Sequence, residues 1–343
     1  MATAWVWTET QPIGVTSGSW TNIDVDESGQ YRLASDYGDR LWRSDDYGIT
    51  WAETRPLGDV AANWRPVAVS GTGQYMTCGV FGGYVYVSDD YGVTWTENQI
   101  SAATRNWYDI AISSTGQYMV ANSYVYYPYV SDDYGVTWSQ KQPAGAVTRL
   151  WRSAAMSANG KYQGLGVYAK RLYLSTDYGV TFPEITPAGA SDLGWESFSI
   201  SATGQYMLAG IGSAGRLYRS DDYGVTWAET QPNGNTDGWW VCLEVSSSGQ
   251  YVIAGNSGGR LYISEDYGVT WDETQPAGNV DANWVCAASA TPFFDGFTVT
   301  GSVGKIYNGA PLLPSKPITP DPADEEVGVD FSDYTLSWVD GDA

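Results

Sequence analysis

The order of apolar and polar residues along the chain is typical of short β-strands joined by tight turns. In one representative stretch, residues 107–113 form an apolar strand, a Ser-Thr-Gly turn follows, and residues 117–121 form a return strand. A third strand is predicted to end at residues 129–130, and a fourth spans residues 137–141 after a polar turn. The stretch therefore predicts a unit of four consecutive strands.

The same unit recurs along the chain with a period of 43 to 45 residues. Its most regular marker is S-D-D-Y-G-V-T-W or a close variant, which begins at Ser44, Ser88, Ser131, Ser175, Ser220 and Ser264. A Gly-Gln-Tyr motif or variant recurs at Gly29, Gly73, Gly116, Gly160, Gly204 and Gly249, with a degenerate form at 295–297. A third marker is the tryptophan that opens each first strand: Trp20, Trp64, Trp107, Trp151, Trp195, Trp240 and Trp284. Seven four-stranded repeats of this length predict an all-β, seven-bladed β-propeller.

The two ends of the chain predict how the ring of blades closes. Residues 6–12 (VWTETQP) repeat the sequence of a fourth strand, as in residues 225–232 (VTWAETQP). The seventh repeat stops after its third strand, at residues 305–308. We therefore expect the N-terminal strand to complete the last blade, because this arrangement leaves no free sheet edge at the junction. The propeller is then predicted to span residues 1–309.

The repeated marker matches the pattern S-x-D-x-G-x-T-W, and the chain here resembles the Asp-box, or bacterial neuraminidase, repeat family. The resemblance covers residues 5–309. It implies a β-propeller and is much less informative about activity. The family includes sialidases and related glycosidases, sortilin-type receptors, and propellers similar to photosystem assembly factors.

The aspartates of the marker are interpreted as scaffold residues that fold the turn between the third and fourth strands. A carboxylate at this position can accept backbone N–H bonds, and the glycine two residues later allows a positive φ angle. Because these aspartates recur from blade to blade, they are expected around the rim and not converging on a catalytic or metal site. They are Asp46, Asp90, Asp133, Asp177, Asp222 and Asp266.

Positions at which the repeats disagree are better candidates for a binding site, since a requirement of the scaffold would be felt in every blade. The residue after the repeated tryptophan varies in this way, and the loops before it add charged and aromatic residues. These positions are expected at one end of the ring, where propellers often bind ligands. The candidate patch comprises Arg65, Arg105, Trp107, Tyr108, Arg149, Arg152, Glu196 and Trp239. Ordinary surface variation, and for the tryptophans packing between blades, fits the same pattern.

The residue inventory excludes most enzyme classes. The chain has no histidine, which rules out Ser-His-Asp triads, histidine-ligated metals and imidazole acid–base catalysis. Glycoside hydrolysis stays open because it needs only two carboxylates or, in sialidases, a tyrosine with a carboxylate partner. The resemblance to sialidases is incomplete, since no F/Y-R-I-P motif precedes Ser44 and the nearest echo is Arg65-Pro66-Val67. We therefore expect a non-enzymatic protein without a cofactor or metal.

The charge of the chain limits its partners. There are 17 Lys and Arg residues against 39 Asp and Glu residues, and the formal charge of −22 disfavours nucleic acid and anionic membranes. No membrane-spanning segment or Sec signal is predicted, so synthesis in the cytoplasm is expected. Cys242 and Cys286 hold the same place in consecutive repeats, and either buried thiols or a bridge between blades fits this placement.

The composition changes after Gly309. Residues 310–324 are rich in proline and predict an extended linker, and residues 325–343 form an acidic tail. Apolar residues alternate in the tail, which is typical of a strand with one buried face. The tail is expected either to fold back on the propeller or to add a strand to a protein partner in an assembly. Its docking residues are Phe331, Tyr334, Leu336 and Trp338.

Together these features suggest a rigid, repetitive head that is presented to a partner. By analogy of architecture, the expected role is that of a virion-type decoration or adhesin component that recognises a glycan or a protein. Display on a virion or an extracellular assembly is the corresponding location. Two alternatives remain open: a sialidase-like or other glycoside hydrolase, and a scaffold similar to photosystem assembly factors.

Overall fold

A computed structural model of the chain describes residues 5–10, 18–101, 103–189, 191–212, 214–289, 297–301 and 304–311. Within them the chain forms 28 β-strands and no helix. They belong to one compact unit that ends at Pro311, two residues beyond the predicted end of the propeller. The predicted docking residues Phe331, Tyr334, Leu336 and Trp338, and most of the predicted linker, lie outside the described residues.

The strands pair into seven antiparallel sheets of four, which are the blades. The first strands are β2 (Trp20–Val25), β6 (Ala62–Val69), β10 (Arg105–Ile112), β14 (Trp151–Met156), β18 (Trp195–Ile200), β22 (Trp240–Val245) and β26 (Ala282–Ser289). The second strands are β3 (Arg32–Asp39), β7 (Met76–Gly83), β11 (Met119–Ser123), β15 (Gln163–Val167), β19 (Met207–Ile211), β23 (Val252–Gly259) and β27 (Phe297–Gly301). The third strands are β4 (Leu41–Ser44), β8 (Val85–Ser88), β12 (Tyr129–Ser131), β16 (Leu172–Ser175), β20 (Leu217–Ser220), β24 (Leu261–Ser264) and β28 (Lys305–Pro311). The fourth strands are β5 (Ala52–Thr54), β9 (Thr96–Asn98), β13 (Ser139–Gln140), β17 (Glu184–Ile185), β21 (Ala228–Thr230), β25 (Asp272–Thr274) and β1 (Trp5–Thr10).

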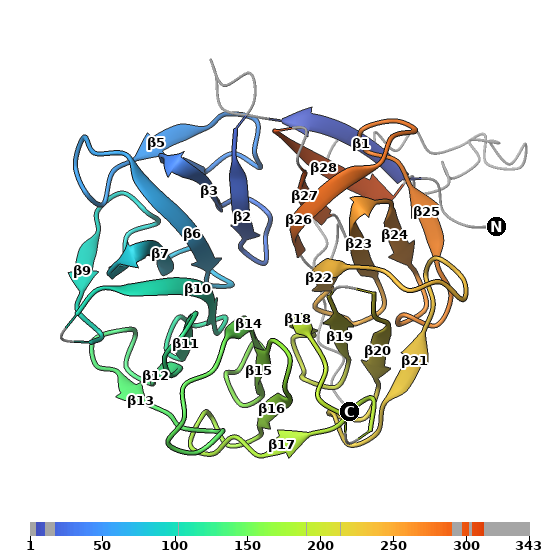
Figure 1. Ribbon diagram of the computed structural model, residues 1–343. Coiled ribbons are helices and arrows are strands. Elements are labelled where there is room, and N and C mark those ends of the chain that lie inside the picture. Colours follow the sequence, from blue (N-terminus) through green and yellow to red (C-terminus); the bar gives the residue numbers. More distant parts are fainter. Residues whose placement is uncertain are drawn as a thin grey trace, which may run out of the picture. The chain divides into compact units, whose positions relative to one another are not determined.

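The seven blades form a closed ring, as the sequence predicts. Each first strand contacts the first strand of the next blade, and β26 of the seventh blade contacts β2 of the first. Figure 1 shows the first strands nearest the centre and the short fourth strands at the outer rim. The fold is therefore an all-β, seven-bladed propeller, and the predicted strands of the third blade are correct to within two residues.

The ring closes through the N-terminal strand, which confirms the closure predicted from the two ends of the chain. Strand β1 pairs antiparallel with β28 along its whole length, from Trp5 opposite Pro311 to Thr10 opposite Ile306. Thr10 also reaches the first blade, because its hydroxyl donates to the carbonyl of Gly48 and accepts the indole N–H of Trp51. A threonine at the same place in other blades makes the same two bonds, so β1 serves as an ordinary fourth strand.

The repeated tryptophans fill the spaces between neighbouring blades. All seven are buried, with Trp107 and Trp240 each 1% exposed. Their indole nitrogens donate to carbonyls of the preceding blade, as in Trp107 to Gly83 at 3.1 Å. Trp107 therefore does not belong to the predicted ligand patch. Burying its large apolar ring between blades stabilises the fold more than exposing it at the surface would.

The Asp-box turns have the geometry that their residue types suggest. In the first box, Asp46 accepts the amide of Thr50 at 2.8 Å and its hydroxyl at 2.6 Å, and also the hydroxyl of Ser44 at 2.9 Å. Burial acts to raise the pKa of Asp46, but these hydrogen bonds outweigh it and hold the pKa below its usual value. The same bonds recur in the other five boxes, so these aspartates belong to the scaffold.

The tyrosines of the Asp boxes have a backbone conformation that the sequence did not predict. The residue between the box aspartate and glycine is in the left-handed region at Tyr47, Tyr91, Tyr134, Tyr178, Tyr223 and Tyr267. This conformation is energetically unfavourable for residues that carry a side chain, because Cβ comes too close to the backbone. For Tyr91, Tyr134, Tyr178, Tyr223 and Tyr267, contact with a tyrosine of the preceding blade offsets the cost. Tyr75 and Tyr134, for example, have ring centroids 5.0 Å apart. The seventh blade has no box, and there Tyr251 packs edge-on against Trp5 instead.

Candidate functional site

The seven first strands surround a central channel with a cavity volume of about 480 Å³. One end, which we call the channel mouth, lies where the first strands begin. It is lined by the residues that follow the repeated tryptophans: Thr21, Arg65, Tyr108, Arg152, Glu196, Val241 and Val285. The far end is lined by the turns after the first strands, where Glu27, Gly71, Ser114, Ala158, Ala202 and Ser247 lie. The mouth therefore carries the varied residues and the far end carries mostly small ones.

Backbone hydrogen bonds tie the far end together. The amide of Ser114 donates to the carbonyl of Ala158 at 2.8 Å, and the amide of Ala158 donates to Ala202 at 3.0 Å. Equivalent bonds join Glu27 to Gly71 and Ala202 to Ser247. These links between successive blades hold the channel in one shape, so the mouth is built on a rigid frame.

At the mouth, arginines and tyrosines form a layered cluster. The guanidinium of Arg65 lies 3.6 Å above the ring of Tyr108, and Arg152 lies 4.8 Å from the same ring. Arg152 also donates a hydrogen bond to the Tyr108 hydroxyl and lies 3.6 Å from the Glu196 carboxylate. Tyr124, from the turn between β11 and β12, stacks on Tyr108 at 5.5 Å. Cation–π contacts and one ion pair thus fix the side chains in place.

The charges of this cluster influence one another. Burial raises the pKa of Glu196, and the nearby guanidinium groups of Arg152 and Arg65 oppose that shift. Burial alone lowers the pKa of Arg152, but Tyr108 and Glu196 outweigh it and leave the pKa above its usual value. Arg152 therefore stays charged at every physiological pH, and the mouth keeps a fixed positive group beside a partly buried acid.

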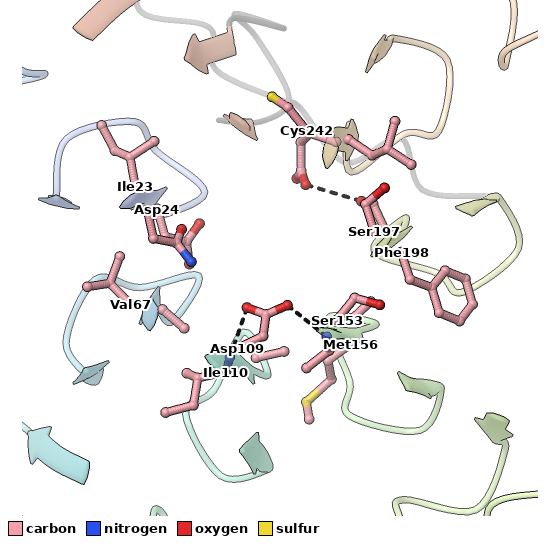
Figure 2. A pocket seen from close by; sticks show the side chains of 18 of the residues that line it. Ile23, Asp24, Val67, Asp109, Ile110, Ser153, Met156, Ser197, Phe198 and Cys242 are labelled. Atoms are coloured by element: carbon pink, nitrogen blue, oxygen red, sulfur yellow. Dashed lines mark hydrogen bonds between the residues drawn. The ribbon is translucent and has the colours of Figure 1, made fainter. Parts of the chain in front are cut away.

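Two further carboxyls project into the channel below the mouth (Figure 2). Asp24 accepts the amides of Val25 at 2.8 Å and Val69 at 2.7 Å, and therefore joins the first blade to the second. Asp109 likewise joins the third blade to the fourth through the amide of Ala154, at 2.8 Å. Burial within the channel walls raises the pKa of each to about 7, although the backbone bonds act in the opposite direction.

The structure brings together only part of the predicted patch. Arg65, Tyr108, Arg152, Glu196 and Trp239 all line the channel mouth, and Trp239 is 48% exposed. The other members lie elsewhere: Trp107 is in the core, and Arg105 and Arg149 lie outside the cavity lining, on the surface next to the mouth that we call the rim.

Sequence reasoning missed Asp24 and Asp109. Both stand at positions where the repeats differ, since the second and fourth blades have Ala68 and Ala155 in place of Asp24. That signal was available, because the same rule led to the mouth residues. The candidates named from the sequence lie at or directly after the tryptophan and in the loops before it, whereas Asp24 and Asp109 lie further along their strands.

The described residues show no arrangement suited to a metal ion, since no three Cys, Asp or Glu side chains are grouped closely enough. The described part of the chain also contains no apolar helix of membrane-spanning length. Cys78 is a buried free thiol, and Cys242 is buried and lines the channel. The side chain of Cys286 lies outside the described residues, so the bridge between these blades stays a prediction.

The ring of blades and its repeated turns are those of a β-propeller that carries Asp-box repeats. Matches to the BNR-Asp box repeat family model at residues 41–54 and 217–231 agree with this class. No curated protein matches the chain by sequence.

Solved propellers are similar in fold. The structure described as YCF48 bound to D1 peptide is 15% identical with a TM-score of 0.66, covering 89% of this chain and 96% of that chain. YCF48 from Cyanidioschyzon merolae is 14% identical with a TM-score of 0.65, covering 88% and 98%. The β-propeller domain of Cps50 (Swd1) from Myceliophteria thermophila is 13% identical with a TM-score of 0.64, covering 88% and 99%. At these identities the likeness concerns the fold alone.

Proposed function

We propose that this protein is a non-catalytic binding propeller that recognises a protein partner at the channel mouth. The observation that carries the proposal is the cluster of Arg65, Tyr108, Arg152 and Glu196, where the repeats diverge while the scaffold around them is repeated. The exposed indole of Trp239 stands beside it. Arginine, tyrosine and tryptophan are the residues that contribute most to binding at protein interfaces. The similar propeller YCF48 is described as bound to a D1 peptide, which supports a peptide-binding role.

The wider role that we propose is that of a rigid head in a larger surface assembly, such as a virion or an adhesin. The closed ring and its rigid channel suit a head that must present one binding surface in a fixed shape. In this proposal residues 325–343 attach the head to the assembly. A glycan partner is the alternative outcome of the binding experiment below.

Binding is tested by probing a peptide array and a glycan array with the intact chain. Peptides are expected to be retained, and Arg65→Gln and Trp239→Ala should each reduce the signal about fivefold or more, because such residues commonly contribute more than 1 kcal/mol. Arg219→Gln is the matched control, since Arg219 lies on β20 away from the mouth and pairs with Asp221 at 3.3 Å. Unchanged peptide signals in both mouth variants, or retention of glycans only, would contradict the proposal.

The sialidase alternative has a specific obstacle in the mouth. A tyrosine nucleophile needs an adjacent base to take its proton. Here Arg152 donates to the Tyr108 hydroxyl and also pairs with Glu196, so a guanidinium lies between the two groups. Arg149 lies outside the cavity lining, so the three arginines of a substrate clamp do not converge on Tyr108.

We therefore expect no turnover of fluorogenic glycosides, including a sialoside, above the rate without protein. The measurement is fluorescence release at several pH values with the intact chain. Turnover that is abolished by Tyr108→Phe or by Glu196→Gln would show that the mouth is an active site. Turnover that both variants retain would point to a contaminating enzyme and leave this expectation intact.

A further inference from the structure

The surface arginines of this acidic protein are paired with carboxylates in most blades. Arg40, Arg171, Arg216 and Arg260 each end the turn between the second and third strands of a blade. Each pairs with a glutamate of the fourth strand and an aspartate of the following loop, as Arg260 does with Glu273 at 3.7 Å and Asp281 at 2.9 Å. The repeat thus neutralises its own positive charges.

The third blade and the loops on either side of it break this rule. Tyr127 replaces the arginine, Gln140 replaces the glutamate, and Thr148 replaces the loop aspartate. Two arginines appear instead, Arg105 at the start of β10 and Arg149 in the loop after the blade. Among the described residues neither forms an ion pair within 4 Å, although a hydrogen bond from Lys170 and, to a smaller extent, the charge of Arg149 lower the pKa of Asp192 in the loop after the fourth blade. Each donates a hydrogen bond to the carbonyl of the preceding threonine.

The rim arginine Arg105 is joined to the channel mouth by a short aromatic turn. Tyr124 and Tyr126 both lie in the turn between β11 and β12. Arg105 lies 4.1 Å from the ring of Tyr126, and Arg152 of the mouth lies 5.0 Å from the ring of Tyr124. Arg65 also has no ion pair among the described residues, and its guanidinium lies over the ring of Tyr108. A band of guanidinium groups therefore runs from the mouth to the rim over the third blade.

The chemistry of the band selects its ligand. A sugar needs open aromatic faces on which to stack, and within the band guanidinium groups already lie over the rings of Tyr108, Tyr124 and Tyr126. Trp239 is exposed at the mouth, beside the band and not within it. The groups that face outward are planar cations, which bind carboxylates through paired hydrogen bonds. Several such cations in a row suit a flexible chain that carries a carboxylate every few residues.

We propose that Arg65, Arg105 and Arg149 bind an acidic polypeptide segment that runs from the channel mouth across the rim of the third blade. This inference rests on the proposed function and adds to it the charge and the path of the partner. Arg65 holds the segment at the mouth, where Arg152 is already paired with Glu196, and Arg105 and Arg149 hold its continuation on the rim.

The test uses fluorescein-labelled octaglutamate as the probe and measures its anisotropy with the intact chain at low salt. Octaglutamate should bind, octaglutamine should not, and added salt should weaken the binding. The double variant Arg105→Gln with Arg149→Gln should raise the Kd about tenfold, as expected for two lost charge-assisted contacts. The matched double variant Arg216→Gln with Arg260→Gln should leave the Kd unchanged, because those arginines are already paired.

Equal Kd values for the two double variants would overturn the rim path. Equally tight binding of a hyaluronan octasaccharide would overturn the assignment to a polypeptide. If octaglutamate fails to bind while array peptides still depend on Arg65, the inference fails and the proposed function stands. If neither probe depends on Arg65, both fail. Melting temperatures of all variants, compared with the unsubstituted chain, show that each result reports binding and not loss of the fold.

Discussion

Removal of residues 1–12 is expected to lower the melting temperature by roughly 10 °C. The deletion takes away β1, which is paired with β28 over six residues, and exposes the edge of the seventh blade. The deletion removes the packing of Trp5 against Tyr251 and Phe297. It also removes the indole hydrogen bonds of Trp5 to Glu265 and of Trp7 to Thr274. Two half-buried indoles and several hydrogen bonds contribute about 5 kcal/mol to the free energy of unfolding. In a domain of this size, each kcal/mol lost lowers the melting temperature by roughly 2 °C.

Point variants on β1 test whether the loss of its contacts, and not the shortening of the chain, lowers the melting temperature. Trp7→Ala should cost about 2 kcal/mol, because the Trp7 ring is half-buried and donates to Thr274 at 2.6 Å. Val6→Ala is the matched control on the same strand, since Val6 points outward and is 47% exposed. Differential scanning calorimetry measures all three proteins. A deletion that melts like the full chain, or equal effects of the two point variants, would show that β1 does not hold the ring together.

Stability is expected to fall as the pH rises from 5 to 8. The pKa values of Asp24 and Asp109 are raised from 3.8 to about 7 in the folded protein, so between these values the folded state holds protons that the unfolded chain has lost. Their stabilising contribution is full below pH 4 and is lost as the pH passes 7. Each shift corresponds to about 4 kcal/mol, and because both residues are only partly buried we expect about 2–4 kcal/mol for each.

The variant with Asp24→Asn and Asp109→Asn should show a much smaller dependence of stability on pH in this range. Urea unfolding at pH 5, 6, 7 and 8 measures the slope. Asp45→Asn with Asp132→Asn serves as control, because these exposed carboxylates next to the boxes should leave the slope as it is. The box aspartates do not interfere, since, although burial acts to raise their pKa values, their hydrogen bonds hold these values below the usual aspartate value, away from this pH range. If the double asparagine variant keeps the slope of the unsubstituted chain, the channel carboxyls do not cause it.

The number of blades and the way the ring closes can be predicted from the sequence alone. Seven tryptophans at a regular interval count the blades, and the copy of a fourth strand at the N-terminus fixes the closure through Thr10 and Trp51. The box aspartates were assigned correctly because their hydrogen bonds lie within four residues, where spacing alone limits the geometry. Arg65, Tyr108, Arg152 and Glu196 were found together because the position after each tryptophan faces the mouth in every blade.

The tertiary structure decided what each side chain meets across the gap between blades. Asp24 has its partner Val69 in the next blade, and the raised pKa follows from burial between first strands that only ring closure brings together. Trp107 was misplaced for the same reason, since the space that buries it belongs partly to the preceding blade. Arg105 and Arg149 differ from the mouth arginines by only three positions along the chain, yet that step carries them from the channel to the rim. A register counted within one blade determines which way a side chain points, whereas the neighbour it meets depends on how the blades pack.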